Sequence, residues 1–510
     1  MTDLIIQLAG AALLLAAFLL LLRLLLKGEK GSVDVREDQV YADEYRPSAD
    51  TDPSIPPLLE PSEAEIESAL AESTLELPES FEQFPSPSSS DILNVFVGLD
   101  FGTSCSKVVI RSVRWENRAL AVPFGRRSGG GLRYLLPTAL YEKQDGLLSL
   151  DEEPGAAVHT DIKRALMEQP NNPRRRALAA GYLALALRKA RIWFIETQHR
   201  EYGHDPLRWS LNMGIPSTWH VDPALRKTFE TVVHAAWDLS LNPAIDLDRA
   251  TAALENVDFE VEMEINVIPE IGAEAVGYLK SPEYRSGLHV IVDVGGGTLD
   301  VCGFGMHRPD GDNAFELFSA KVTNLGAYVL HERRYDAAME QGTVPRLPRA
   351  MPHPLSPIPS ASEYALKNVA NLTEVFERVD AKYKDECTCV IMFVLSELRR
   401  TSPNDRHWKT GLPVFRAGGG AQLDVVEEAL SDASSRAARN WDDVASFRLQ
   451  PLSGIRIHRA PEDILPRLAV AYGLSFDADD IGRFRNPSEH EKFPPRPVAR
   501  SVPEISKDQV

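Results

Sequence analysis

The chain has 510 residues, of which 44% are hydrophobic and 25% are charged, a composition typical of a globular protein large enough for two or more lobes. Its net charge of −19 argues against nucleic acid as a main partner, because binding to phosphate backbones needs an excess of Lys and Arg. The four cysteines are too few and too unevenly spaced for a disulfide framework, which is typical of a reducing compartment.

The N-terminal segment is apolar from Leu4 to Leu22, a run of 19 positions in which Gln7 is the one strongly polar residue. This length suffices to cross a bilayer, so we predict a transmembrane helix over residues 4–26. A cleaved signal peptide is the alternative, but no basic region precedes the run and no small-residue cleavage site follows it. Basic residues follow the run and Asp3 precedes it. We therefore expect a single-pass protein of the inner (cytoplasmic) membrane, with its N-terminus outside and everything downstream in the cytoplasm.

Residues 31–91 have a different composition, with 16 acidic and 2 basic residues and frequent Pro and Ser. Such a segment buries too little apolar surface to order itself. We predict a disordered acidic linker that holds the downstream part away from the anionic membrane surface. Within it, Ser62–Thr74 has a weak helical pattern that would suit either a docking partner or a solvated stretch.

From residue 92 onward, strand-like and helix-like patterns alternate, which predicts an α/β fold. The long helical patterns are Ala177–Tyr202, Pro223–Leu241 and Ser362–Arg400. Asp222 is the expected N-cap of the second helix. Trp209–Pro216 has the pattern of a strand, and the prolines in Thr343–Pro359 predict a loop.

A glycine-rich motif lies at His289–Phe304 (HVIVDVGGGTLDVCGF). An apolar run ends near Asp293, three glycines follow, and a second apolar run begins, which predicts two strands joined by a tight turn. Successive N–H groups in such a turn converge on an anion, so phosphate is the natural ligand. On its own, such a motif is more often only a hairpin.

The same layout occurs about 190 residues earlier, at Val95–Ile110 (VFVGLDFGTSCSKVVI), with Asp100 at the end of the first strand. A third glycine turn, Gly418–Gly420, also follows an apolar run. Two such hairpins predict two related lobes, residues 92–285 and 286–478, that hold one nucleotide between them. The polar segment 479–510 is a predicted flexible tail.

These motifs resemble the nucleotide-binding fold shared by actin, sugar kinases and DnaK-type heat-shock chaperones, and most closely the ATPase domain of the chaperones. The segments that carry the resemblance are Val97–Ser104 as the first phosphate loop, Val292–Val301 as the second phosphate loop, Asp161–Leu166 around the catalytic lysine, Val267–Tyr278 as the crossover stretch, Thr323–Ala327 as a phosphate-contacting turn and Gly418–Gly420 as the adenosine turn. No Gly-x-x-x-x-Gly-Lys-Ser/Thr P-loop occurs, which excludes that class of ATPase.

The resemblance implies a two-lobed actin-like ATPase fold with ATP or ADP and Mg²⁺ in a cleft between the lobes. It implies that Asp100 and Asp293 hold Mg²⁺ through waters, and that Lys163 stabilises the transferring phosphoryl group. The implied catalytic residues are Lys163, Glu270, Asp293 and Thr298. The implied nucleotide-binding residues are Asp100, Gly102, Thr103, Ser104, Gly295, Gly296, Gly297, Gly326, Gly418, Gly419 and Gly420. From the residues alone, the alternatives are that Lys163 is a solvated charge and that Glu270 is an acid that begins a helix.

The chain departs from the chaperones in two respects. Gln422 stands where the chaperones have a basic residue that stacks on the base, so we expect altered base affinity. No peptide-binding domain or apolar interdomain linker follows Ser475, so we expect no conventional client refolding.

The leading hypothesis is a membrane-tethered, DnaK-like ATPase that hydrolyses ATP slowly and acts as a nucleotide-dependent switch on an unidentified, membrane-associated protein partner. The alternatives are an actin-like polymer or scaffold that recruits partners to the membrane, a small-molecule kinase of the same fold, and a pseudo-ATPase. Fold alone does not decide between them.

Overall fold

The computed structural model describes residues 92–112, 119–125, 127–202, 206–259, 263–307, 314–349, 358–369, 371–450 and 452–485. All of them fall within one of the two units into which the chain divides, Leu58–Val510. The predicted transmembrane helix and acidic linker, and most of the predicted tail, lie outside the described residues. Within the described ranges, no helix combines the length and the apolar character that a membrane span requires. The described part has the α/β class that the sequence predicted.

The first large sheet contains seven strands among the described residues. They are β1 (Leu93–Asp100), β2 (Cys105–Ser112), β3 (Ala119–Ala121), β8 (Leu207–Ile215), β9 (Glu264–Pro269) and β15 (Ile457–His458), in the order β15-β3-β2-β1-β8-β9, with β4 (Leu136–Pro137) beside β2. β1 and β2 form the predicted hairpin, with Asp100 opposite Lys107. β8 runs parallel to β1, and β9 runs parallel to β8.

The second large sheet contains six strands within the same described ranges. They are β10 (Gly287–Val294), β11 (Leu299–His307), β12 (Ala314–Thr323), β13 (Pro413–Ala417), β14 (Arg448–Gln450) and β16 (Arg483–Arg485), in the order β14-β13-β10-β11-β12-β16. β10 and β11 form the second predicted hairpin, and β12 continues it antiparallel to β11. β13 runs parallel to β10, and β14 runs parallel to β13.

The two sheets share one topology. In each, three strands form an antiparallel meander, and two later strands add in parallel beside the first strand. The helices that follow corresponding strands are α4 (Pro173–Tyr202) and α11 (Thr373–Thr401), α6 (Pro223–Leu239) and α13 (Asp424–Asn440), and α8 (Glu270–Leu279) and α14 (Leu465–Leu474). The aspartates of the two hairpins, Asp100 and Asp293, therefore lie at the same end of equivalent strands, β1 and β10.

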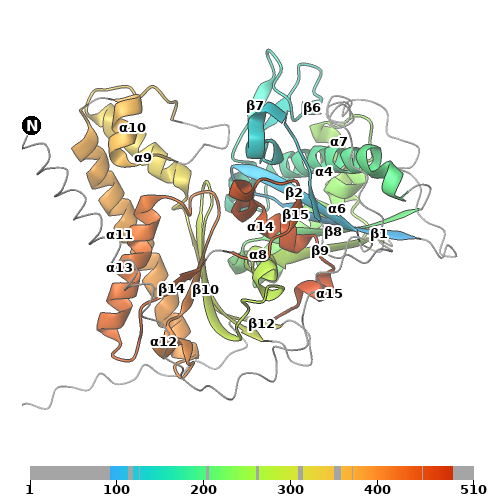
Figure 1. Ribbon diagram of the computed structural model, residues 1–510. Helices are drawn as coiled ribbons and strands as arrows, with labels where there is room; N and C mark the ends of the chain where they lie inside the picture. Colours follow the sequence, from blue (N-terminus) through green and yellow to red (C-terminus); the bar gives the residue numbers. More distant parts are fainter. Residues whose placement is uncertain are drawn as a thin grey trace, which may run out of the picture. The chain divides into compact units, whose positions relative to one another are not determined.

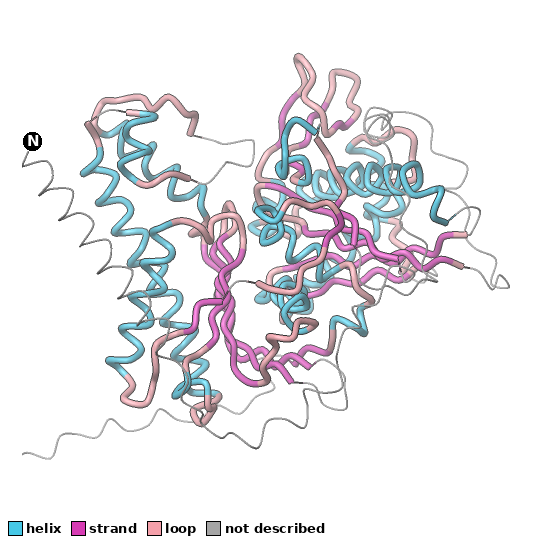
Figure 2. The backbone as a smooth tube through the Cα atoms, in the orientation of Figure 1, coloured by secondary structure: helices cyan, strands magenta, loops and turns pink. Residues whose placement is uncertain are grey.

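Helices cover both faces of each sheet (Figures 1 and 2). α4 and α6 share a core with β1, and α11 and α13 share another with β10. α8 packs through Ile271 and Tyr278 on Phe304 and Phe415 of the second sheet. α14 packs through Leu468 on β2 of the first sheet. α8 and α14 therefore lie between the two sheets, and strands covered on both faces are apolar at almost every position.

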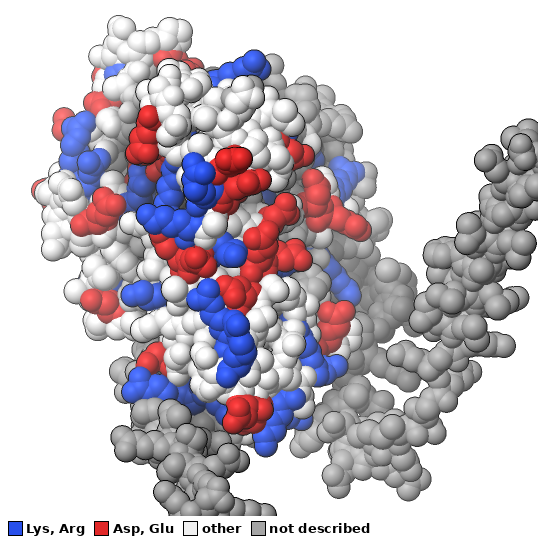
Figure 3. Space-filling model, turned by 90° about the vertical axis from the view of Figure 1, so that its left-hand side faces the viewer, with Lys and Arg blue, Asp and Glu red and all other residues white. Residues whose placement is uncertain are grey.

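The outer layer formed by α11 and α13 carries charges of both signs that mix over its surface (Figure 3). Arg436 of α13 pairs with Asp432 on its own helix at 2.7 Å and with Asp385 of α11 at 3.5 Å. Pairs of this kind are typical of a solvated helical face.

Shorter elements complete the described part. The small three-stranded sheet consists of β5 (Leu140–Glu142), β6 (Leu148–Ser149) and β7 (Ala157–His159). The other helices are α3 (Ile162–Glu168), α5 (Ser217–His220), α7 (Leu247–Glu255), α9 (Ala327–Glu340), α10 (Ala361–Asn368), α12 (His407–Thr410) and α15 (Ala478–Ile481), with the 3-10 helices η3 (Arg127–Tyr134) and η5 (Glu462–Ile464).

The long elements predicted from sequence patterns are confirmed. α4, α6 and β8 match the predicted helices and strand, and the third helical pattern forms α10 and α11. The carboxylate of Asp222 caps α6 by accepting hydrogen bonds from the N–H groups of Ala224 and Leu225. In the predicted loop, the described residues 343–349 and 358–359 form neither helix nor strand.

Two glycines allow α14 to pack at backbone distance on its neighbours. A Cβ atom on Gly98 of β1 would overlap the carbonyl oxygen of Ala471, and a Cβ atom on Gly473 would overlap that of Ala273 in α8. α14 is therefore held on two sides, and this contact fixes the position of Arg467 near its N-terminus.

Candidate functional site

A pocket lies where the β1–β2 and β10–β11 hairpin turns meet, and both sheets contribute to its wall together with α3, α8 and α14. Its volume is about 90 Å³, which leaves room for several water molecules. The predicted site residues that line it are Asp100, Gly102, Thr103, Ser104, Lys163, Glu270, Asp293, Gly295, Gly296, Thr298, Gly418, Gly419 and Gly420. Gly297 and Gly326 do not line it.

The first two glycine turns lie in direct contact with each other at the wall of this pocket. A Cβ atom on Gly296 would overlap the side chain of Ser104, and one on Gly297 would lie 2.7 Å from a methyl carbon of Thr103. The second turn is closed by a hydrogen bond from the N–H group of Gly295 to the carbonyl oxygen of Thr298, 2.9 Å. Turns separated by about 190 residues in the sequence therefore form one wall.

Gly326 supports the second turn, to which Gly297 belongs, from outside the pocket. The N–H groups of Gly326, Ala327 and Tyr328 donate to the carbonyl oxygens of Gly297, Gly295 and Gly296, at 3.1, 2.9 and 2.8 Å. The beginning of α9 is thus bonded to the turn, and a side chain on Gly326 would overlap its backbone. The sequence placed Gly326 at the nucleotide, whereas in the structure it braces the turn.

The third glycine turn approaches the carboxylate of Asp293. Gly418 has a φ angle of +78°, which favours glycine, and a Cβ atom there would overlap Oδ1 of Asp293. The N–H group of Gly420 donates to the carbonyl oxygen of Val294, 2.8 Å. The third turn is therefore bonded to the second through its backbone, and the second turn packs on the side chains of Thr103 and Ser104 in the first.

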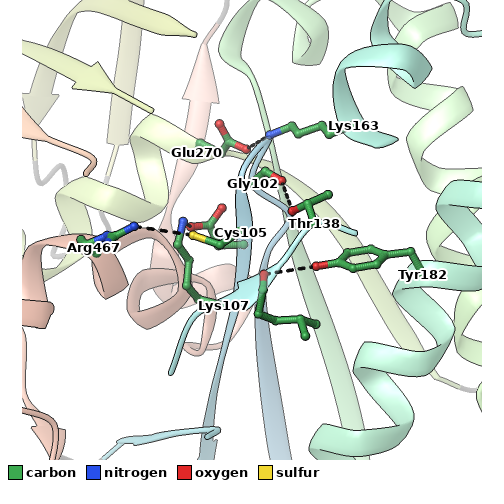
Figure 4. Close-up of polar contacts among 10 residues, drawn as sticks. Gly102, Cys105, Lys107, Thr138, Lys163, Tyr182, Glu270 and Arg467 are labelled. Carbon is green, nitrogen blue, oxygen red and sulfur yellow. Dashed lines mark hydrogen bonds and ion pairs between the residues drawn. The ribbon is translucent and has the colours of Figure 1, made fainter. Parts of the chain in front are cut away.

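Lys163 of α3 and Glu270 of α8 form an ion pair at the wall of the pocket, with Nζ 2.7 Å from Oε1 (Figure 4). The Lys163 residue is 4% exposed. This burial excludes the alternative in which Lys163 is a solvated surface charge. Glu270 is the first residue of α8, which agrees with the alternative that it is an acid at a helix start. Its carboxylate also lines the pocket.

Lys107 is a pocket residue that the sequence analysis missed. Its Nζ donates to Oδ2 of Asp100 at 2.8 Å, and both side chains are largely buried. Burial lowers the pKa of Lys107, but the neighbouring Asp100 carboxylate outweighs it and raises the pKa above its ordinary value. The hairpin predicted from the sequence could have indicated Lys107, because strand pairing places it directly opposite Asp100.

Arg467 is a second cation that the sequence analysis missed. It lies on α14 and its Nη2 is 3.8 Å from Sγ of Cys105, next to the first turn (Figure 4). Its guanidinium also lies beside Gly419, where a Cβ atom would be 3.2 Å from Nε. No local pattern pointed to it, because α14 reaches the pocket only through the packing of the whole fold.

Glu274 is a buried carboxyl group one helical turn after Glu270 on α8, and it also lines the pocket. Among the described residues, neither its Oε2 nor Oδ1 of Asp293 has a hydrogen-bond partner. Burial, followed by the charges of Asp293 and Asp100, raises the pKa of Glu274 well above its ordinary value. Burial, followed by Glu270 and Asp100, raises the pKa of Asp293 to about 7.

The two predicted metal ligands differ in how well they suit Mg²⁺. Asp293 has an unpartnered oxygen in the pocket, whereas Asp100 already pairs with Lys107. Across the described residues, no three His, Cys, Asp or Glu side chains are arranged to hold a bare metal ion.

We expect Glu274→Gln to stabilise the ligand-free full chain more at about pH 8 than at about pH 5. Because the folded-state pKa is raised, the stability contributed by Glu274 is fully present below its ordinary pKa of 4.5 and is lost as the pH rises toward the folded-state pKa. Thermal unfolding of both proteins at the two pH values measures this, with Glu428→Gln on the exposed face of α13 as control. An equal change in Tm at both pH values would contradict it.

A scan against models of known protein families gives no match to this chain, and a search of the curated proteins gives none either. The pocket brings four carboxyl groups, those of Asp100, Glu270, Glu274 and Asp293, together with three cations. The glycine turns offer backbone N–H groups, and Lys107, Lys163 and Arg467 supply positive charge from three separate elements.

Proposed function

We propose that this protein has a two-lobed, actin-like ATPase fold and is a nucleotide-dependent switch that binds ATP or ADP in the pocket and hydrolyses ATP slowly. The observation that carries the proposal is the meeting of the three glycine turns with Asp293, Lys163 and Glu270 between two sheets of the same topology. Ligands of open α/β sheets bind at the carboxyl ends of the strands, which is where both hairpin aspartates lie.

Different groups of the chain would have different roles in phosphoryl transfer. Backbone N–H groups of the turns would hold the phosphate oxygens, and Lys163 would stabilise charge on the transferring group. Glu270, which is held by Lys163, would orient the attacking water. Asp293 would hold hydrated Mg²⁺ through its unpartnered oxygen. Bound Mg²⁺ would supply further neutralisation of the phosphate charge.

Two sheets linked by helices at one pocket suit a switch, because domain closure around a ligand changes the surface offered to a partner. The N-terminal apolar segment would tether this switch to the membrane, with the pocket in the cytoplasm. The partner would then be a membrane-associated protein whose binding follows the nucleotide state.

We expect Mg-ATP to raise the Tm of the purified full chain in detergent micelles. A ligand at about 100 times its Kd stabilises the folded state by about 2.7 kcal/mol, which is a readily measured shift. Gly296→Ala would push on Ser104 and reduce the shift, whereas Gly125→Ala, whose Cβ would have ordinary contacts, would leave it unchanged. Melting that does not respond to millimolar Mg-ATP would contradict the proposal.

A further inference from the structure

Within the part of the chain that the structure describes, Arg467 is a cation without a carboxylate partner. The other two cations of the pocket are paired lysines, Lys107 with Asp100 and Lys163 with Glu270. Among the described residues, the polar contact of Arg467 is the weak one to Sγ of Cys105 at 3.8 Å. A half-buried guanidinium with free N–H donors at a pocket wall is well suited to an anionic oxygen of a ligand.

The position of Arg467 places it on the phosphate side of the pocket. Cys105 directly follows the first glycine turn, and the guanidinium lies next to it with Lys107 close by (Figure 4). On its other side, Arg467 packs against Gly419 of the third turn. It therefore bridges the first turn, whose N–H groups would hold a phosphate chain, and the third turn.

Apart from Arg467, the described residues of the pocket near the third turn offer little that could read a base. Its described lining includes the apolar side chains of Ala327, Ile358, Leu423 and Pro466. Gln422 is exposed and is not part of the lining. An apolar wall discriminates weakly between ligands of similar shape, whereas strong discrimination needs buried hydrogen-bonding groups that the wrong ligand leaves unpaired.

We propose that Arg467 binds the phosphate chain and that the pocket selects its ligand by the phosphates and not by the base, so that nucleoside triphosphates of any base are ligands. This inference rests on the proposed nucleotide binding and names the ligand class of that site. Arg467 is then a specificity-determining residue, and it supplies from α14 a cation that neither of the two hairpins provides.

The test is titration calorimetry of the full chain in detergent micelles with Mg²⁺ and, in turn, ATP, GTP, CTP, UTP and adenosine. We expect the four triphosphates to bind with Kd values within about tenfold of one another, and adenosine to bind far more weakly than ATP. Arg467→Met is expected to weaken all four triphosphates alike, by roughly ten- to a hundredfold, which is the usual effect of losing a charge-assisted hydrogen bond.

Two variants act as controls for this change. Arg456→Met replaces an exposed arginine of the same C-terminal segment and should leave every Kd unchanged. Arg467→Lys keeps the charge without the planar guanidinium, and its loss should be smaller than that of Arg467→Met. Because Arg467 has no ion-pair partner among the described residues, neither substitution leaves a buried carboxylate uncompensated.

Several results would overturn the inference while leaving nucleotide binding intact. One is a preference for ATP of more than about tenfold over another triphosphate, and another is adenosine that binds as well as ATP. A third is a loss of triphosphate affinity in Arg467→Met that is below tenfold or confined to ATP. A wild-type chain that binds none of the triphosphates would instead overturn the proposed function itself.

Discussion

Replacing Lys163 with methionine is expected to lower the rate of ATP hydrolysis by roughly 10²–10³, because the loss of one preorganised donor to a developing charge typically has an effect of this size. The Nζ of Lys163 is held 2.7 Å from Glu270 and has further N–H donors available for a phosphoryl oxygen. ATP affinity should change much less, since the glycine turns and the other two cations remain. Phosphate release in single turnovers, together with calorimetric Kd values, separates the two effects.

The control for this prediction is Lys367→Met, which removes an exposed lysine from α10 and should leave hydrolysis unchanged. Lys163→Met leaves the Glu270 carboxylate without its partner, so loss of folding has to be separated from loss of catalysis. The double variant Lys163→Met with Glu270→Gln removes both charges and should fold while remaining inactive. Hydrolysis by Lys163→Met within about tenfold of the wild-type rate would refute the catalytic role.

Gly473→Ala is expected to destabilise the protein by about 3 kcal/mol. In a helix without neighbours, the same change would stabilise by roughly 1 kcal/mol, because alanine is the better helix former. Here the new methyl group would overlap the carbonyl oxygen of Ala273 in α8, so α14 and α8 would have to separate, and overpacking of this kind costs roughly 1–3 kcal/mol or more. The expected sign is therefore opposite to that of helix propensity.

Urea unfolding of the ligand-free full chain measures this free energy, with Gly125→Ala as the matched control. A Cβ atom on Gly125 would have its nearest neighbour at 3.6 Å, an ordinary contact, so that variant should stay close to wild type. A stability of Gly473→Ala equal to or above that of wild type would mean that α14 does not pack on α8 as described.

The sequence predicted the individual hairpins and long helices well because their signals are local. Both Asp-tipped hairpins form β1–β2 and β10–β11, and Asp222 caps α6 as expected. Alternating or continuous apolar positions reflect which faces of an element are buried, and glycine in a turn reflects the backbone angle it needs. Each of these patterns lies within about 20 consecutive residues, so it can be recognised without knowing the rest of the fold.

Most residues predicted for the site do line the pocket. The pocket residues that were not predicted are brought there by strand pairing, helical spacing or helix packing. The register of one hairpin is enough to place Lys107 beside Asp100, and the helical spacing from Glu270 is enough to place Glu274 at the pocket. Arg467 depended on α14, which comes from the end of the described chain and packs at backbone distance on α8 and β1.

By itself, the sequence therefore determined the strands, turns and helices and the two aspartates at the ends of equivalent strands. Only the tertiary structure decided that the turns meet, that Lys163 is buried against Glu270, and that Gly326 braces a turn instead of lining the pocket. The physical reason is that turn angles and apolar periodicity are properties of neighbouring residues. Ion pairing and close backbone approach depend on how distant elements pack, and no local pattern specifies that packing.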